Sequence, residues 1–424
     1  MAISVFFALL CLAGYSSGLQ LKIEGQRNVR PRHELLRRGN IDGTAGLNNV
    51  KDIGYYTNLT LGGQLFTVSI DTGSSDLWVA GNITDSIDTG KTSEVVYVVG
   101  EAGGPVKLST LQLAGYTVQD QAFMQVTPDS DTIGTGLIGL GPTSSSNIYA
   151  TLNTSAGYAV LDRIFLQNTS TPNYLTVLLG RTQDPTDVFP GDMSIGELLD
   201  GYSNVESQPK LEVTVVPVRE SGNQHFQILL DEDGISGPDG KPISITTEVN
   251  QTSNSKQATA ILDTGYTFSQ VPKSVADAIY SRFSGAEYRN VTDVGNVWIV
   301  PCDEEVNITF KFSGNSYYIH PLDATMDPSL VDLPDLHNLV NSEGQSSCIG
   351  SFQPIASAAI SDTYDMILGM SFLRNVYAVF NFGDFVAGGN DTTIRGDPYI
   401  QLLSTTDPAE AHSDFVTVRL SGVV

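Results

Sequence analysis

The chain contains few basic residues and, beyond its first 12 residues, no long apolar run. Its 424 residues include 22 Lys and Arg against 47 Asp and Glu, a formal net charge of −25. Because nucleic acids and anionic membrane surfaces bind through clustered Lys and Arg, we expect neither as a partner. A helix that crosses a bilayer needs about 20 apolar residues, so we expect no membrane-spanning segment.

Cysteine is also scarce, which excludes a disulfide-rich scaffold. The three cysteines are Cys11, Cys302 and Cys348, and no two have the Cys-x-x-Cys spacing of many zinc sites. We therefore expect no metal, and no cofactor is needed for the chemistry inferred below. Cys11 lies in a segment that we expect to be removed, which leaves an even pair. In an oxidising compartment one disulfide is the natural interpretation, and two buried free thiols are the alternative.

The N-terminus combines an apolar run with a basic segment. Ile3–Leu12 is too short to span a bilayer but is typical of a signal peptide, which predicts secretion. A buried N-terminal strand is the alternative. The first 38 residues hold six basic and two acidic residues, ahead of a very acidic body. This predicts a propeptide that is held electrostatically and cut after Arg38, and a solvated basic tail is the alternative.

Asn-x-Ser/Thr sequons are frequent, and in a secreted chain we expect some to carry glycans on exposed loops. They lie at Asn58, Asn82, Asn153, Asn168, Asn250, Asn290, Asn307 and Asn390.

The composition favours a folded, strand-rich chain. Hydrophobic residues make up 41%, and 41 Gly and 19 Pro interrupt short β-branched runs. One helix is expected after Pro272, with Ser274 as its N-cap and Val275, Ile279 and Phe283 on its buried face. Strands are expected at 66–70, 94–99, 107–113 and 211–218.

An internal repeat carries most of the information. The sequence VSIDTGSS at 68–75 matches AILDTGYT at 260–267. Downstream of the first copy lies GLIGLG at 136–141, and downstream of the second lies MILGM at 366–370. Each half is thus an apolar strand that ends in Asp-Thr-Gly, followed later by an apolar strand that ends in Gly. The repeat predicts a duplicated lobe.

Two Asp-Thr-Gly turns that meet at a pseudo-twofold axis would place Asp71 and Asp263 side by side. Two carboxyl groups that close cannot both ionise, so they share one proton. The ionised group takes a proton from a bound water, while the protonated group donates to a substrate carbonyl. The alternative is that both aspartates are structural turn residues.

At these motifs the chain resembles the pepsin-like aspartic proteases, particularly secreted fungal members, from about residue 48 to the C-terminus. The resemblance implies an all-β, bilobal fold with a cleft between two lobes, protein or peptide substrates and a monomer. It also implies that Asp71 and Asp263 are catalytic. The expected organisation is a signal peptide at 1–18, a propeptide at 19–47, an N-terminal lobe at 48–205 and a C-terminal lobe at 206–424.

The resemblance assigns further roles to single residues. Thr72 and Thr264 are expected to hydrogen-bond across the axis, and Ser74 to support the first aspartate. Gly73 and Gly265 complete the two active-site turns. Cys302 and Cys348 match the family's disulfide in the C-terminal lobe.

The family also covers its cleft with a hairpin flap that carries a tyrosine. Tyr97 is the best match and Trp78 matches the residue that supports it, although an ordinary strand tyrosine and a core tryptophan are the alternatives. Two positions depart from the family pattern, since Val98 replaces a usual Gly and Tyr266 a usual Thr or Ser. Thr267 is an alternative hydroxyl donor to Asp263, but its side chain starts on the opposite face of an extended chain.

Three functions therefore compete. The leading hypothesis is an acid endopeptidase. A non-catalytic binding or inhibitor protein on the same fold is favoured by Tyr266 and Val98 and disfavoured by the two intact aspartates. A glycosylated wall or surface protein with a coincidental repeat would have neither paired aspartates nor a cleft.

Overall fold

The computed structural model describes residues 43–421 except 98–99, 129–131, 168–170, 187–188, 248, 250–251, 292–293, 331–335, 357–358, 360 and 387–395. The predicted signal peptide (1–18) and nearly all of the predicted propeptide (19–47) lie outside these residues. Strands dominate the described chain, so the all-β prediction is confirmed. No helix among the described residues is long and apolar enough to cross a membrane.

One eight-stranded sheet forms the N-terminal half of the molecule, with the order β2-β3-β4-β9-β5-β8-β7-β6. Its strands are β2 (Asn48–Val50), β3 (Gly54–Leu61), β4 (Gln64–Asp71), β5 (Leu77–Ala80), β6 (Ile87–Val96), β7 (Glu101–Leu113), β8 (Tyr116–Val126) and β9 (Thr135–Gly139).

Three smaller sheets form the C-terminal half, with the orders β13-β15-β24-β16-β23, β14-β19-β20 and β17-β18-β22-β21. Their strands are β13 (Gln227–Leu229), β14 (Ile235–Ser236), β15 (Thr259–Leu262), β16 (Ser269–Val271), β17 (Glu287–Val291), β18 (Gly295–Pro301), β19 (Ile308–Phe312), β20 (Asn315–Ile319), β21 (Thr325–Met326), β22 (Ser347–Gly350), β23 (Phe352–Pro354) and β24 (Met366–Leu368).

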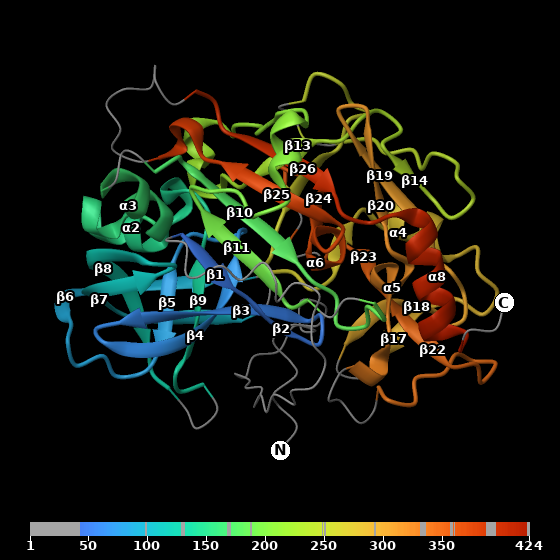
Figure 1. Cartoon of the computed structure of the whole chain (residues 1–424), viewed down its shortest axis with the longest axis horizontal. Coiled ribbons are helices and arrows are strands. Elements are labelled where there is room, and N and C mark those ends of the chain that lie inside the picture. Colours follow the sequence, from blue (N-terminus) through green and yellow to red (C-terminus); the bar gives the residue numbers. More distant parts are fainter. Residues whose placement is uncertain are drawn as a thin grey trace.

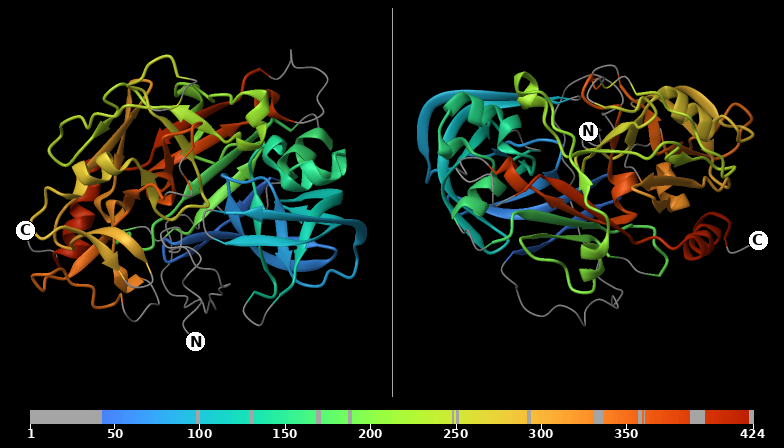
Figure 2. Two further views of the ribbon diagram at one scale, coloured as in Figure 1. Left: turned by 180° about the vertical axis from the view of Figure 1, so that it is seen from behind. Right: turned by 90° about the horizontal axis from the view of Figure 1, so that it is seen from above.

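A six-stranded sheet lies between the two halves and draws strands from both, in the order β1-β11-β10-β25-β26-β12. Figure 1 shows it crossing the middle of the molecule, and Figure 2 shows the two halves on either side from behind and from above. The prediction of two β lobes is thus confirmed, while the boundary at 205/206 stays a prediction. The strands are β1 (Thr44–Gly46), β10 (Tyr174–Leu179), β11 (Gly191–Ile195), β12 (Leu211–Glu212), β25 (Val376–Asn381) and β26 (Tyr399–Ser404).

The two halves repeat one pairing pattern around each Asp-Thr-Gly motif. In the first, β9 pairs parallel with β4 and antiparallel with β5, which pairs parallel with β8. In the second, β24 pairs parallel with β15 and antiparallel with β16, which pairs parallel with β23. The duplication predicted from the sequence repeat therefore holds strand by strand.

The helices of the described residues are short. They are α2 (Asn147–Leu152), α3 (Val160–Gln167), α4 (Lys273–Tyr280), α5 (Pro321–Ala324), α6 (Met370–Leu373) and α8 (Pro408–Arg419).

Two local expectations were wrong in detail. Helix α4 has Pro272 at its N-cap with no side-chain cap, so Ser274 lies in the first turn, and Phe283 lies beyond the helix end. The strand expected at 211–218 is limited to β12, because the Val216 N–H donates to the side chain of Gln224 rather than to a neighbouring strand.

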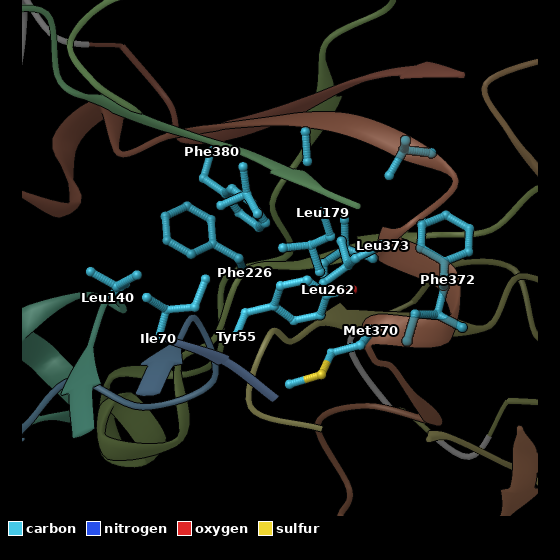
Figure 3. Close-up of a cluster of buried hydrophobic side chains, with 14 of the residues drawn as sticks. Tyr55, Ile70, Leu140, Leu179, Phe226, Leu262, Met370, Phe372, Leu373 and Phe380 are labelled. Carbon is cyan, nitrogen blue, oxygen red and sulfur yellow. The ribbon is translucent and has the colours of Figure 1, made fainter. Parts of the chain in front are cut away.

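The apolar core runs beneath both Asp-Thr-Gly turns. Ile70 and Leu262 each precede an aspartate and are fully buried. Both belong to one cluster with Tyr55, Phe226 and Leu373 (Figure 3). Because protein cores are close-packed, this shared cluster fixes the two strand ends relative to each other.

A buried ion cluster also ties the halves together. Asp323 accepts hydrogen bonds from Arg374 Nε at 2.5 Å and Arg181 Nε at 3.0 Å. Arg181 follows β10, and Arg374 also donates to the Asp52 carbonyl at 3.1 Å. Burial alone would raise the pKa of Asp323, but the two guanidinium groups more than offset it and hold that pKa below its usual range.

Candidate active site

The two Asp-Thr-Gly turns meet between the halves and bond reciprocally. The Thr72 N–H donates to Thr264 Oγ1, and the Thr264 N–H donates to Thr72 Oγ1, each at 3.0 Å. Each hydroxyl in turn donates to the strand residue before the opposite aspartate: Thr72 to the Leu262 carbonyl at 2.9 Å and Thr264 to the Ile70 carbonyl at 3.1 Å. Four hydrogen bonds thus lock the turns face to face.

Glycine is required at the third position of each turn because the opposite aspartate approaches it closely. A Cβ on Gly73 would lie 2.0 Å from Asp263 Oδ2, and one on Gly265 would lie 2.6 Å from Asp71 Oδ1. Each glycine also donates its N–H to the aspartate of its own turn, Gly73 to Asp71 at 2.9 Å and Gly265 to Asp263 at 2.6 Å. The turns therefore bring the two carboxyl groups together, as the repeat predicts.

Both carboxyl groups are almost removed from solvent, since Asp71 and Asp263 are each 5% exposed. Burial, and then the neighbouring charge of Asp71, raise the pKa of Asp263 well above its ordinary value despite the Gly265 N–H. These surroundings favour the protonated form of Asp263.

The two aspartates have different side-chain support. Ser74 Oγ donates to Asp71 Oδ2 at 2.5 Å. Tyr266 holds the matching position after Asp263, and it packs against the buried cluster of Ile261, Ala359 and Ile367 in the second half. The hydroxyl of Thr267 donates instead to the Ile53 carbonyl at 2.7 Å. This agrees with the expectation that its side chain lies on the opposite face of the chain from Tyr266.

The hairpin of β6 and β7 reaches over the cleft. Tyr97 follows β6, and Trp78 Nε1 donates to its hydroxyl at 3.0 Å. Burial and then the charge of Asp71 raise the pKa of Tyr97 well above its ordinary value, so this tyrosine stays neutral. The departure at Val98 lies outside the described residues.

Both aspartates open into a cleft of about 780 Å³. Its walls are largely apolar and come from both halves of the molecule. Sequence reasoning did not identify His225 and Tyr364, which line it beside the aspartates. Tyr364 lies two residues before the second apolar-Gly strand and could have been found from that motif, whereas no sequence signal surrounds His225.

The remaining predicted sites lie away from the cleft. A disulfide joins Cys302, in the turn after β18, to Cys348 in β22, with a Cα–Cα distance of 4.9 Å. Within the described ranges, no group of three or more His, Cys, Asp or Glu side chains could hold a metal ion.

The sequons are unevenly placed, and glycosylation at any of them stays a prediction. Asn307 is half-buried and accepts a hydrogen bond from Tyr318, which makes it the least accessible of those described. The exposed sequons are Asn58, Asn82, Asn153 and Asn290, and those outside the described residues are Asn168, Asn250 and Asn390.

Comparison with known proteins places this geometry in a family. Similar proteins include major aspartyl peptidase 1 of Cryptococcus neoformans var. grubii, 28% identical over 84% of this chain and 73% of the relative. Vacuolar protease A of Aspergillus fumigatus is 26% identical over 87% of this chain and 84% of the relative. The crystal structure of an aspartic proteinase from Irpex lacteus shares the fold, with a TM-score of 0.63 at 18% identity, over 87% of this chain and 99% of that one.

The family described as eukaryotic aspartyl protease matches residues 54–388, which include both Asp-Thr-Gly turns, the flap hairpin and the cleft. The chain therefore belongs to the eukaryotic aspartyl protease family and is an aspartic endopeptidase.

Proposed function

We propose that the protein is a secreted acid endopeptidase that hydrolyses peptide bonds with a water activated by Asp71 and Asp263. The observation that carries this proposal is the pair of buried carboxyl groups at the floor of the cleft, locked together by Thr72 and Thr264. Paired carboxyl groups that share one proton supply a general base and a general acid at the same place.

The unequal support of the two aspartates assigns their roles. Each aspartate accepts a glycine N–H, but Ser74 donates a hydroxyl to Asp71, while burial favours a proton on Asp263. Asp71 then accepts a proton from the attacking water, and Asp263 donates to the substrate carbonyl oxygen. The resulting diol collapses when a proton reaches the leaving amine, so neither a metal nor a covalent intermediate is required.

Tyr97 and Trp78 would act as the flap of this site. The bond between them fixes the tyrosine ring above the cleft, and exposed Val96 beside it gives the flap an apolar edge. A closed flap excludes bulk water and strengthens the electrostatic interactions of the aspartates.

The N-terminal segments support secretion as an inactive precursor. The basic segment would be attracted to the acidic body at neutral pH and released as acid protonates carboxylates. Strand β1 lies within the range first assigned to the propeptide and pairs with β11, which favours a cut before Thr44, such as the one after Arg38. N-terminal sequencing of protein from culture medium tests both points, and a start at Leu19 would contradict removal of a propeptide.

The alternative of a non-catalytic binding protein is motivated by Tyr266, which departs from the family pattern at the second aspartate, and is disfavoured by the family membership. The wall-protein alternative is wrong, since it requires separated aspartates and no cleft. Cleavage of an acid-denatured protein substrate, measured with and without a statine-type inhibitor, separates the remaining two. We expect cleavage only in acid and full inhibition, whereas inhibitor binding without cleavage would favour the binding protein.

A further inference from the structure

A histidine lines the cleft beside Asp71, and the catalytic mechanism does not use it. His225 lies between the 3₁₀ helix Val218–Asn223 and strand β13. Among the described residues that line the cleft, it is the one side chain that can carry a positive charge. The rest of the lining is apolar or neutral, apart from Asp71 and Asp263 themselves.

The imidazole is held firmly in place. Its ring meets the edge of the Tyr364 ring at 90°, with 6.0 Å between the centroids. The preceding residue, Gln224, is 3% exposed, and its carbonyl accepts from Ser145 Oγ at 2.5 Å. The side chain of Gln224 also donates to the Thr214 carbonyl at 3.1 Å. His225 is therefore presented by a fixed backbone rather than by a free loop.

The imidazole gains its positive charge only in acid, because its surroundings lower its pKa. Burial lowers the pKa of His225 below its ordinary value, while the Gly73 backbone and the charge of Asp71 act in the opposite direction. The other titratable group against the ring is Tyr364, whose pKa is raised to about 12 by burial and by Asp263, so it stays neutral. Below the imidazole pKa the cleft therefore holds one cation.

His225 is half-buried and lines the cleft, so a bound substrate can reach its ring. The chain as a whole carries a net charge of −25, which repels the acidic side chains of a substrate at positions away from His225. A substrate carboxylate would thus find a single attractive position in the cleft.

We propose that His225 is a specificity-determining residue that binds the carboxylate side chain of a substrate residue close to the scissile bond. This inference rests on the proposed endopeptidase function. A charge-assisted hydrogen bond between imidazolium and carboxylate is stronger than a neutral one. The preference should therefore be clearest between the pKa of the substrate carboxyl group and that of the imidazole, and fade on either side of this window.

The test uses the full-length mature protein and internally quenched peptides with one fixed cleavage site. Glu, Gln or Leu is placed in turn at each of the positions that flank the scissile bond, and kcat/KM is measured for wild type, His225→Tyr and His225→Gln. At one position we expect the Glu:Leu ratio of kcat/KM to fall about tenfold in His225→Tyr. His225→Gln should lose the Glu:Gln preference but keep the Gln:Leu preference, since an amide donates without a charge.

His412→Gln is the matched control, because His412 is exposed and pairs with Glu305 at 2.8 Å outside the cleft. It should leave every ratio as in wild type. Equal Glu:Leu ratios in wild type and both His225 variants at every position would overturn the inference. Failure of the wild type to cleave any peptide would instead overturn the proposed function, so the two results are distinguishable.

Discussion

The two active-site turns have the same backbone and different chemistry. Each follows a buried strand, donates a glycine N–H to its aspartate and exchanges threonine hydrogen bonds with the other. The first aspartate also receives a hydroxyl from Ser74, whereas the second has Tyr266 at the matching position. Duplication thus supplied two equivalent frames, and in the proposed mechanism one side chain separates the base, Asp71, from the acid, Asp263.

The two halves also contribute different residues to the walls of the cleft. The N-terminal half contributes a hairpin with Tyr97 held by Trp78. The C-terminal half contributes an aromatic wall of His225, Tyr364 and Tyr266. In the proposed function, the first side would cover a substrate and the second would contact its side chains.

The largest expected effect is on kcat, and it should be similar for the two aspartates although their side-chain support differs. Asp71→Asn and Asp263→Asn should each lower kcat by about 10²–10⁴-fold, because an amide can neither accept the water proton nor hold the shared one. Circular dichroism should show an unchanged fold. If one variant kept most of its activity, the two aspartates would not act as a pair.

The next largest effect is on stability and concerns Asp323, the carboxylate of the buried ion cluster that joins the halves. Asp323→Asn should lower the free energy of unfolding by about 3–5 kcal/mol, because Arg181 and Arg374 would lose their buried counter-charge. Asp239→Asn is the control, since Asp239 pairs with Arg282 at a more exposed site 2.8 Å apart and should matter far less. Equal decreases in the free energy of unfolding by urea in the two variants would show that the buried cluster contributes no more to stability than the exposed pair.

The disulfide lies in the C-terminal half, so its removal should destabilise that half alone. Cys302 and Cys348 lie 46 residues apart, so replacing both with Ser should cost about 3–4 kcal/mol through loop-closure entropy. Hydrogen exchange should increase mainly in β17, β18 and β22, with little change around Asp71. Uniformly increased exchange in both halves would contradict this local effect.

The smallest effect tests the difference between the turns directly. A hydroxyl that donates to a carboxylate stabilises its ionised form and lowers its pKa. Ser74→Ala should therefore move the acidic limb of the kcat/KM profile to higher pH by about one unit, and Tyr266→Thr should move it to lower pH by up to the same amount. No shift in Tyr266→Thr, together with an altered substrate preference, would mean that Tyr266 acts only as part of the cleft wall.

The sequence was informative where function depends on a local pattern. The repeat around Asp71 and Asp263 predicted the paired turns and the parallel strands behind them, because strand, aspartate and glycine are adjacent in the chain. His225 was not predicted, because its place in the cleft depends on the 3₁₀ helix before it and on Tyr364, which lies far along the chain in the segment before β24. The ion cluster around Asp323 was missed for the same reason, since its three members come from segments far apart in sequence.

The central claim is that Asp71 and Asp263 share one proton in the working enzyme. Infrared spectroscopy of protonated carboxyl groups, recorded at the pH of maximal activity, measures this most directly when wild type is compared with Asp263→Asn. We predict that the wild type contains one protonated carboxyl group that the variant lacks. Identical protonated-carboxyl signals in the two proteins would mean that Asp263 carries no proton at that pH, and would contradict the account.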